Sequence, residues 1–333
     1  MMNRTEQGVL HQSRVINLLT QILWLITFCL SQAIVADTSH EKTSQPGKHI
    51  TLVYTAESTL HSQIANQVTA SLSQQYSGLE ISEIKLPDKN IVSNNKTGLV
   101  VAIGTDSIQT ANTYFHNSRK LLIASNPAAY TPGEKQDSQS AVLYMTQPYC
   151  RQIQFITLIN NRWNTVGYLS NRIRPVDNKA ILRCAKQYGI TTYNVSTSPD
   201  ERLTSNIKDL LSHSDLLLAL PDNTIYNSKS VKNILLTSYR QRKPLIAFSQ
   251  SFVNAGALAS IYSSTGQIAD SAIRLVKQHL EQGRGFTKTV NYPENFDISF
   301  NSQVFRALDL EIPDADEIKH AIDIKEKEKA GDH

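Results

Sequence analysis

From residue 49 onward, short apolar runs alternate with longer segments in which apolar residues recur at helical spacing. The run HITLVYT (49–55) predicts a strand. The segment after it places Ile64, Val68 and Leu72 four residues apart, which predicts a helix with one buried face. Further strands are predicted in LEISEIKL, TGLVVAIG, KLLIASNP and AVLYMT, and a second helix in DSIQTANTYFHN. Strands and helices that alternate in this way are typical of parallel sheets with helices on both faces.

The same alternation restarts after residue 146. Helices are predicted in PYCRQIQFITLIN, NKAILRCAKQYG, ERLTSNIKDLLSH and KSVKNILLTSYRQR, and strands in NTVGYLS, ITTYNVST, DLLLALPD and KPLIAFSQ. A later strand, LASIYSS, and a long helix, GQIADSAIRLVKQHLEQG, indicate that the chain crosses back before it ends. We therefore expect an α/β protein of two doubly wound parallel-sheet lobes joined by a hinge. Lobe 1 comprises residues 49–146 with part of 261–283, and lobe 2 comprises 147–260 with part of 287–312.

The amino-terminal segment has the pattern of an export signal. Arg4 and Arg14 precede the apolar run VINLLTQILWLITFCL, and small residues follow it. A basic start, an apolar core and small residues describe a secretory signal peptide, with cleavage expected after Ala33 or Ala36. An uncleaved anchor is the alternative, but the run is shorter than the ~20 residues that span a bilayer. We expect residues 1–36 to be a cleavable signal peptide and the mature protein to reside in the periplasm.

Composition and charge suit an ordinary globular protein. Hydrophobic residues make up 40% of the chain and charged residues 19%. The formal net charge is only +4, and no dense Lys/Arg patch with interleaved aromatic residues occurs, which argues against a nucleic-acid partner. The mixed-charge run KEKEK near the end predicts that residues 313–333 form a solvated, flexible tail.

Sequence motifs give no support for catalysis. The chain contains no Walker-type loop, no Gly-x-Gly-x-x-Gly after the first strand, no Gly-x-Ser-x-Gly and no His-Glu-x-x-His. His61, His116 and His213 fit ordinary helix-surface or helix-end positions. Beyond the signal, Cys150 and Cys184 permit one disulfide or remain two buried thiols. We expect no enzyme activity, no cofactor and no metal; a two-lobed exported protein fits ligand capture by hinge closure better.

Five segments together resemble one protein family. They are VVAIGTDSIQTA, LLIASNP, LLLALPDNTIYNSKSVKNIL, KPLIAFSQSFVNAGALASIY and NYPENFDISFNSQVFRALDLEIP. In this order, they resemble ABC-transporter substrate-binding proteins of the type I periplasmic-binding-protein fold, in the branch that includes tryptophan- and tyrosine-binding members. The resemblance covers roughly residues 49 to 313. It implies a periplasmic component that captures a small polar ligand and delivers it to an ABC permease.

The candidate ligand-binding residues lie just after predicted strands, where α/β sheets bind small molecules. They are Glu57, Ser58, Thr105, Asp106, Ser107, Asn126, Asn171, Asp222, Asn223, Ser249, Gln250 and Ser251. Two roles are open for Asp222 and Asn223, contact with the ligand or formation of a turn alone. Two roles are also open for Thr105, Asp106 and Ser107, which either bind an acceptor oxygen of the ligand or only cap a helix. Tyr226 is a packing residue or a stacking wall, and Tyr262 is a candidate for the border of the cleft.

Departures from the resembled family bear on the ligand. Asn126 stands where many members carry aspartate, and Ser249, Gln250 and Ser251 stand where they carry acidic residues suited to an amino group. A buried ammonium needs a charge partner, and Asp222 is the one motif-matched acid left on lobe 2 to supply it. We therefore expect a neutral or anionic polar ligand and weak or no binding of ordinary amino acids.

Three functions remain open from the sequence. The first is a solute-binding subunit of an ABC uptake system. The second is a periplasmic sensor of the same fold that passes ligand occupancy to a membrane receptor without import. The third is an enzyme with an unrecognised site.

Overall fold

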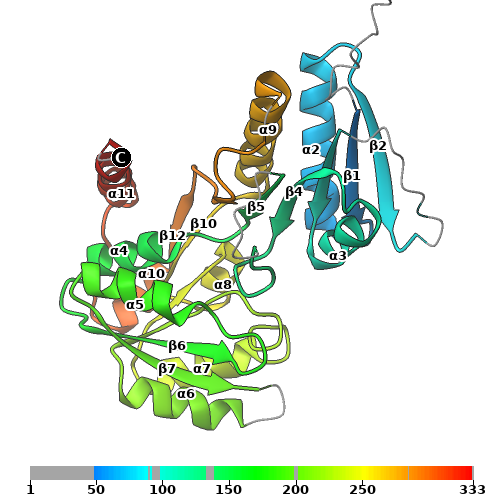
Figure 1. The fold of residues 1–333 in the computed structure, drawn as a ribbon. Coiled ribbons are helices and arrows are strands. Elements are labelled where there is room, and N and C mark those ends of the chain that lie inside the picture. Colours follow the sequence, from blue (N-terminus) through cyan, green and yellow to red (C-terminus); the bar gives the residue numbers. More distant parts are fainter. Residues whose placement is uncertain are drawn as a thin grey trace, which may run out of the picture. The chain divides into compact units, whose positions relative to one another are not determined.

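The structure, a computed structural model, describes residues 49–88, 91, 98–132, 139–198, 202–283 and 285–331. The expected signal peptide lies outside the described residues. Two six-stranded sheets organise the described chain, and we call the sheets with their helices lobe 1 and lobe 2. The expectation of an α/β fold with two largely parallel sheets is confirmed (Figure 1).

The sheet of lobe 1 has the strand order β11-β5-β4-β3-β1-β2, and all of its pairs are parallel. Its strands are β1 (His49–Thr55), β2 (Glu80–Leu86), β3 (Leu99–Ile103), β4 (Arg119–Ala124), β5 (Ser140–Tyr144) and β11 (Val290–Asn291). Helices α2 (Thr59–Gln75) and α9 (Thr265–Gln282) lie side by side over one face (Figure 1), and α3 (Thr105–Tyr114) covers the other. The sheet is therefore buried on both faces, which explains the continuous apolar runs in its central strands.

The sheet of lobe 2 repeats this arrangement in the order β12-β10-β9-β8-β6-β7. Its strands are β6 (Thr165–Asn171), β7 (Thr191–Thr197), β8 (Leu216–Leu218), β9 (Leu245–Ala247), β10 (Ala259–Tyr262) and β12 (Asp297–Phe300), and β12 is antiparallel to β10. Helices α6 (Leu203–Ser212), α7 (Val231–Arg240) and α8 (Gln250–Ala255) share one hydrophobic cluster with the sheet. Helices α4 (Tyr149–Ile159), α5 (Asn178–Gln187), α10 (Ser302–Ala307) and α11 (Ala315–Gly331) share the other.

The cysteine pair, left open by the sequence, forms a disulfide. Cys150 on α4 and Cys184 on α5 are bonded, with their Cα atoms 4.8 Å apart. The bond ties two neighbouring helices on one face of lobe 2.

The carboxy-terminal segment differs from the expected flexible tail. Residues 315–331 form helix α11, and Ile318 and Ile322, four residues apart, are buried in the core of lobe 2. Their spacing is that of an amphipathic helix with a narrow apolar face. Many charged residues follow these two isoleucines and obscure the amphipathic pattern. For this reason the sequence alone predicted a flexible tail.

The polypeptide passes from one sheet to the other three times, and we call these connecting segments crossings. One buried side chain contacts two of the crossings. The crossings follow β5, β10 and β11. Arg151, at 5% exposure, donates from Nη1 to Gln147 Oε1 (2.6 Å) in the first crossing and to the Pro293 carbonyl (3.0 Å) in the third. Gln147 Nε2 donates to Ser263 Oγ (2.8 Å) in the second crossing, and Ser263 Oγ donates to the Asn295 carbonyl (2.6 Å).

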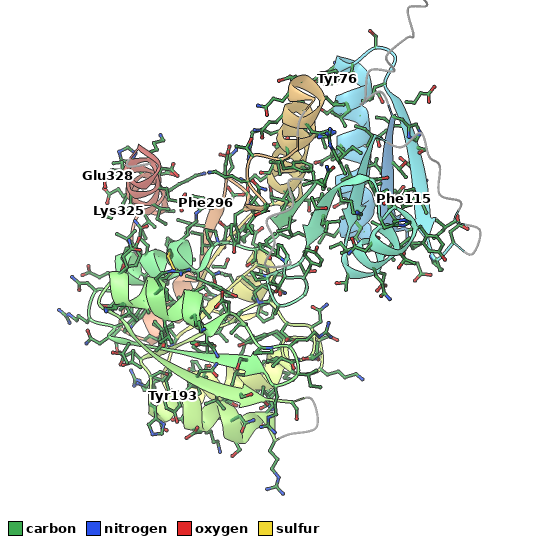
Figure 2. The ribbon with its side chains drawn as sticks, viewed as in Figure 1. Tyr76, Phe115, Tyr193, Phe296, Lys325 and Glu328 are labelled. Carbon is green, nitrogen blue, oxygen red and sulfur yellow. A yellow bond between two sulfur atoms is a disulfide. The ribbon has the colours of Figure 1, made fainter. Side chains whose placement is uncertain are left out.

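Helix α11 supplies the charge partner of this arginine. Glu326 accepts hydrogen bonds from Arg151 Nε (2.7 Å) and Nη2 (2.5 Å), so the pair is bidentate. The guanidinium also lies 4.6 Å from the ring centroid of Phe296, which Figure 2 labels. The last helix is thereby joined to the crossings, and the charged carboxy terminus has a structural role.

We predict that Glu326→Ala lowers the free energy of unfolding by about 1–3 kcal/mol, because it leaves a buried guanidinium without its carboxylate. The loss is smaller than for a fully buried ion pair because the Glu326 side chain is 35% exposed. Chemical denaturation gives the value, with Glu328→Ala as the matched control, since that side chain is 61% exposed. Equal effects of the two substitutions would contradict this role of Glu326.

Candidate functional site

The carboxyl ends of two strands in each lobe mark the expected site. In lobe 1 the strand order reverses between β1, which ends at Thr55, and β3, which ends at Ile103. In lobe 2 it reverses between β6, which ends at Asn171, and β8, which ends at Leu218. Open α/β sheets bind ligands at such reversal points, because the loops diverge there and leave a crevice.

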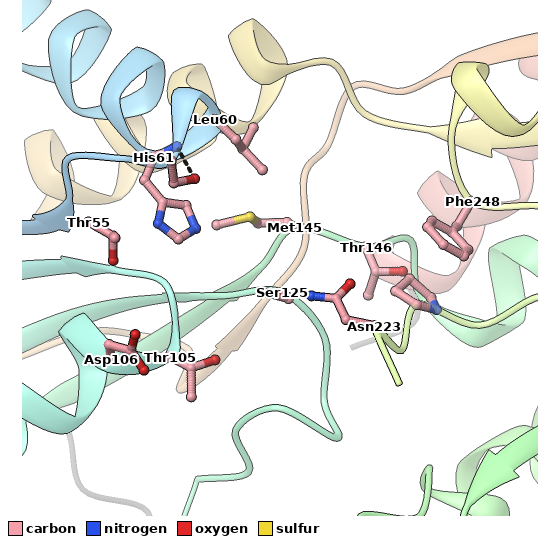
Figure 3. A pocket seen from close by; sticks show the side chains of 12 residues that line it. Thr55, Leu60, His61, Thr105, Asp106, Ser125, Met145, Thr146, Asn223 and Phe248 are labelled. Atoms are coloured by element: carbon pink, nitrogen blue, oxygen red, sulfur yellow. Dashed lines mark hydrogen bonds between the residues drawn. The ribbon is translucent and has the colours of Figure 1, made fainter. Parts of the chain in front are cut away.

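A pocket of about 490 Å³ lies at these points and has walls from both lobes (Figure 3). Lobe 1 and the crossing after it contribute Thr55, Ser58, Leu60, His61, Thr105, Asp106, Ser125, Met145 and Thr146, and lobe 2 contributes Pro221, Asn223 and Phe248. Hydroxyl groups dominate the wall of lobe 1, whereas lobe 2 adds an amide and an aromatic ring. The pocket suits a polar molecule with one apolar face.

A second, smaller pocket of about 140 Å³ adjoins the first. The two share Thr105, Ser125, Pro221 and Asn223. The smaller pocket adds Asn126, Ala128, Ala129, Arg174, Asp222 and Thr224. Shared lining residues make the two pockets parts of one continuous cleft.

His61 forms part of the wall on lobe 1. Ser58 caps helix α2 by accepting from the His61 backbone N–H (3.3 Å), which fixes the first turn beside the cleft. The imidazole lies directly against Gly104, whose φ of +91° is rare for any residue with a side chain, and a Cβ at Gly104 would overlap His61 Cε1. Among the described residues, His61 Nδ1 is buried without a hydrogen-bond partner. His61 thus lies near the helix end, as its position in the sequence predicted, and it also lines the larger pocket.

The wall on lobe 2 depends on a short chain of hydrogen bonds. Asp222 Oδ1 accepts from the Thr224 backbone N–H (2.8 Å) and from Thr224 Oγ1 (2.5 Å). Thr224 Oγ1 accepts in turn from Nδ2 of the buried Asn171 (2.8 Å). Asp222 thus performs the turn chemistry anticipated for it and also lines the smaller pocket. Asn171 holds the loops after β6 and β8 together instead of lining either pocket.

A direct hydrogen bond joins the two lobes beside the cleft. Asn126 Nδ2, from the loop after β4, donates to the carbonyl of Pro221 (2.7 Å) after β8. Asn126 Oδ1 accepts from the Ala129 backbone N–H (2.9 Å). Both functions of the amide are used, and this residue contributes to the wall mainly as a link between lobes.

The aromatic wall has support behind it. Phe248 lines the larger pocket, and Tyr226 lies edge-on to it with ring centroids 5.9 Å apart. Phe252 packs against Phe248 at 4.9 Å. Desolvation by burial raises the pKa of the Tyr226 hydroxyl, and the negative charge of Asp222 raises it further, so the hydroxyl stays protonated. Of the two roles considered for Tyr226, packing fits the structure, because the side chain is buried and lines neither pocket. Tyr262 does not line either pocket.

The twelve residues predicted from the sequence divide into two groups. Six line one or both pockets: Ser58, Thr105, Asp106, Asn126, Asp222 and Asn223. The other six do not: Glu57, Ser107, Asn171, Ser249, Gln250 and Ser251. Ser107 is fully buried in α3, and Ser249 and Ser251 hydrogen-bond one another (2.9 Å) at the start of α8. The expectation that ordinary amino acids bind weakly rested partly on Ser249, Gln250 and Ser251, which do not line the cleft. Whether the cleft can hold an ammonium group therefore depends on Asp106 and Asp222, which do line it.

Sequence reasoning missed several residues of the cleft. They are Thr55, Leu60, His61, Ser125, Met145, Thr146, Arg174, Pro221, Thr224 and Phe248, with the small Ala128 and Ala129. Four of them, Ser125, Pro221, Thr224 and Phe248, directly precede or follow a predicted residue, and most of the others lie further along the loops and helices that follow the strands. In the described ranges, no group of His, Cys, Asp and Glu is placed to hold a metal ion. No helix within those ranges has the length and apolar character needed to cross a membrane.

Comparisons with known proteins identify the family. A family model described as ABC transporter substrate binding protein matches residues 147–321, just over half of the chain. The chain therefore belongs to this family of substrate-binding proteins, and the resemblance seen in the sequence is confirmed. A comparison with curated proteins found no match.

Solved structures agree with the fold. A substrate-binding protein with adhesive properties from Clostridium difficile, in a ligand-free, open form, is 18% identical, with a TM-score of 0.62 over 80% of this chain and 96% of its own. An ABC domain in complex with L-Trp from Streptococcus pneumonia is 18% identical, with a TM-score of 0.56 over 79% and 96%. A conserved domain protein from Vibrio cholerae is 16% identical, with a TM-score of 0.56 over 80% and 96%. At these identities the likeness establishes the fold.

We predict that His61 makes the folded protein less stable in mild acid. Burial lowers the pKa of His61, and the nearby Asp106 charge opposes this only in part. The unfolded chain therefore binds the proton more readily, and stability falls as the pH drops through the ordinary histidine pKa of about 6.5. Thermal denaturation of the ligand-free protein between about pH 7.5 and about pH 5.5 should show a smaller loss for His61→Gln than for the wild type. His116→Gln, at an exposed position, is the control and should lose as much stability as the wild type. If His61→Gln also loses as much stability as the wild type, His61 is not the group that destabilises the protein in acid.

Proposed function

We propose that this protein is the periplasmic solute-binding component of an ABC-type uptake system, and that it captures a small polar ligand between its two lobes by hinge closure. The observation that carries the proposal is the convergence of both reversal points on one polar cleft. Membership of the substrate-binding family supports the same function. Export by a cleavable signal at residues 1–36 and delivery to an ABC permease in the inner membrane are parts of this proposal.

Hinge closure is supported by the arrangement of the crossings. Gln147, Ser263 and Asn295 lie on three different crossings, and their hydrogen bonds connect these segments at one place. A narrow set of linked segments lets two rigid lobes rotate while each hydrophobic core stays intact. Ligand buried between the lobes then gains contacts with both walls only in the closed form, which makes binding and closure one event.

Native mass spectrometry of protein purified from its own periplasm tests the proposal. We expect a bound small molecule that is released on unfolding, and a mature chain that begins after Ala33 or Ala36. Deletion of the gene should then abolish uptake of that molecule. Binding with undiminished uptake would favour the sensing alternative, and chemical turnover of the bound molecule would favour an enzyme.

Asp222 offers a sharper test of the cleft, because both of its hydrogen bonds from Thr224 go to one oxygen, Oδ1. Asp222→Ala removes the acceptor that holds Thr224 and should weaken both ligand-free stability and binding, the latter by more than ~1.5 kcal/mol. Asp222→Asn keeps an acceptor for Thr224 and removes the charge. Titration calorimetry should show weaker binding for Asp222→Asn with a nearly unchanged ligand-free melting temperature, because a hydroxyl or ammonium donor of the ligand would lose a charged acceptor.

The matched control is Asp270→Asn, at an exposed position on α9. If Asp222→Asn binds as tightly as that control, Asp222 serves the turn alone.

A further inference from the structure

The smaller part of the cleft contains a cation that the sequence interpretation did not include. Arg174 follows β6 and lines the 140 Å³ pocket from lobe 2. Among the described residues that line either pocket, no other is a lysine or an arginine. A lone cation at a strand-order reversal point is placed to define the charge of a ligand.

Arg174 is held in place through its backbone, which leaves its side chain available. Asn171 Oδ1 accepts from the N–H groups of Ile173 (2.8 Å) and Arg174 (3.2 Å), and the Asn171 side chain is itself anchored to Thr224. The Arg174 guanidinium makes no hydrogen bond or ion pair with the described residues, although Asp222 lines the same pocket. Its charge is therefore not satisfied within the described chain.

The remaining wall favours the same sign of ligand charge. Thr105, the first residue of the ten-residue helix α3, lines the pocket from lobe 1, and no side chain caps that helix. A helix start presents free N–H groups and a partial positive charge. Asn223 adds an amide donor from lobe 2. Of the two nearby acids, Asp106 lines only the larger pocket, and one oxygen of Asp222 is occupied by Thr224.

We propose that the ligand carries an oxyanion, a carboxylate or a phosphate, which binds in the smaller pocket between Arg174 and the start of α3. The rest of the ligand then extends into the adjoining 490 Å³ pocket, where Phe248 and the hydroxyl-rich wall of lobe 1 receive it. Because Arg174 and Thr105 belong to different lobes, one anionic group contacts both and favours their approach. This inference rests on the proposed solute-binding function and adds the charge class of the ligand and the residue that selects it.

A thermal-shift screen at low ionic strength, followed by titration calorimetry, tests the proposal. The probes are small carboxylates, sugar phosphates and zwitterionic amino acids, with neutral sugars and nucleosides as the uncharged class. We expect at least one anionic probe to raise the melting temperature of the wild type. Arg174→Ala should weaken its binding by about 10- to 100-fold, and Arg174→Lys by less, because lysine keeps the charge and loses the bidentate geometry.

Arg183→Ala is the matched control, since it removes the same charge from an exposed position on α5 that lines neither pocket. Melting temperatures of the ligand-free variants establish that Arg174→Ala is folded. Comparison of simple carboxylates with amino acids then shows whether an ammonium beside Asp222 adds to binding.

Three results would overturn the inference: equal affinity of Arg174→Ala and Arg183→Ala for the anionic probe, stabilisation by neutral probes alone, or no stabilisation by any anionic probe. Stabilisation by neutral probes alone would leave the solute-binding function intact, whereas a screen without any stabilising compound would count against both.

Discussion

A guanidinium with 5% exposure cannot remain unpaired, and this requirement organises the region where the chain passes between lobes. Arg151 receives its carboxylate from Glu326 and its remaining acceptors from Gln147 and Pro293. These partners come from α11 and from two different crossings. The cleft has walls from both lobes, so its geometry depends on the segments that this side chain and the Gln147–Ser263 bond hold together.

Much of the fold was predictable because its signals are periodic and local. The apolar runs around β1, β3 and β4 and the spaced apolar residues of α2 carry enough information to assign both sheets. Helix α11 was not predictable in this way, because only Ile318 and Ile322 mark its buried face among many charges. The site was half predictable. Strand ends indicated where ligand contacts belong, but the direction of a side chain in a loop depends on partners far away in the sequence, as Asn171 and Thr224 show.

The cleft residues also illustrate why a ligand role and a structural role need not exclude each other. Ser58 caps α2 and lines the larger pocket, and Asp222 stabilises its turn while it lines the smaller one. A side chain held by local hydrogen bonds loses little further freedom when ligand arrives, which reduces the entropic cost of binding. The close contact of Gly104 with the His61 ring has a similar consequence, since the imidazole has little space in which to change its orientation.

The Asn126–Pro221 hydrogen bond links the two walls of the cleft in the absence of ligand. An amide both donates and accepts, and Asn126 uses its donor across the lobes and its acceptor within its own loop. A carboxylate at the same position would place two acceptors opposite the Pro221 carbonyl and would lose the link. One such bond contributes roughly 0.5–1.5 kcal/mol net, whereas micromolar binding of a ligand supplies about 8 kcal/mol. The bond can therefore bias the separation of the lobes before ligand arrives, but ligand contacts with both walls are large enough to determine it.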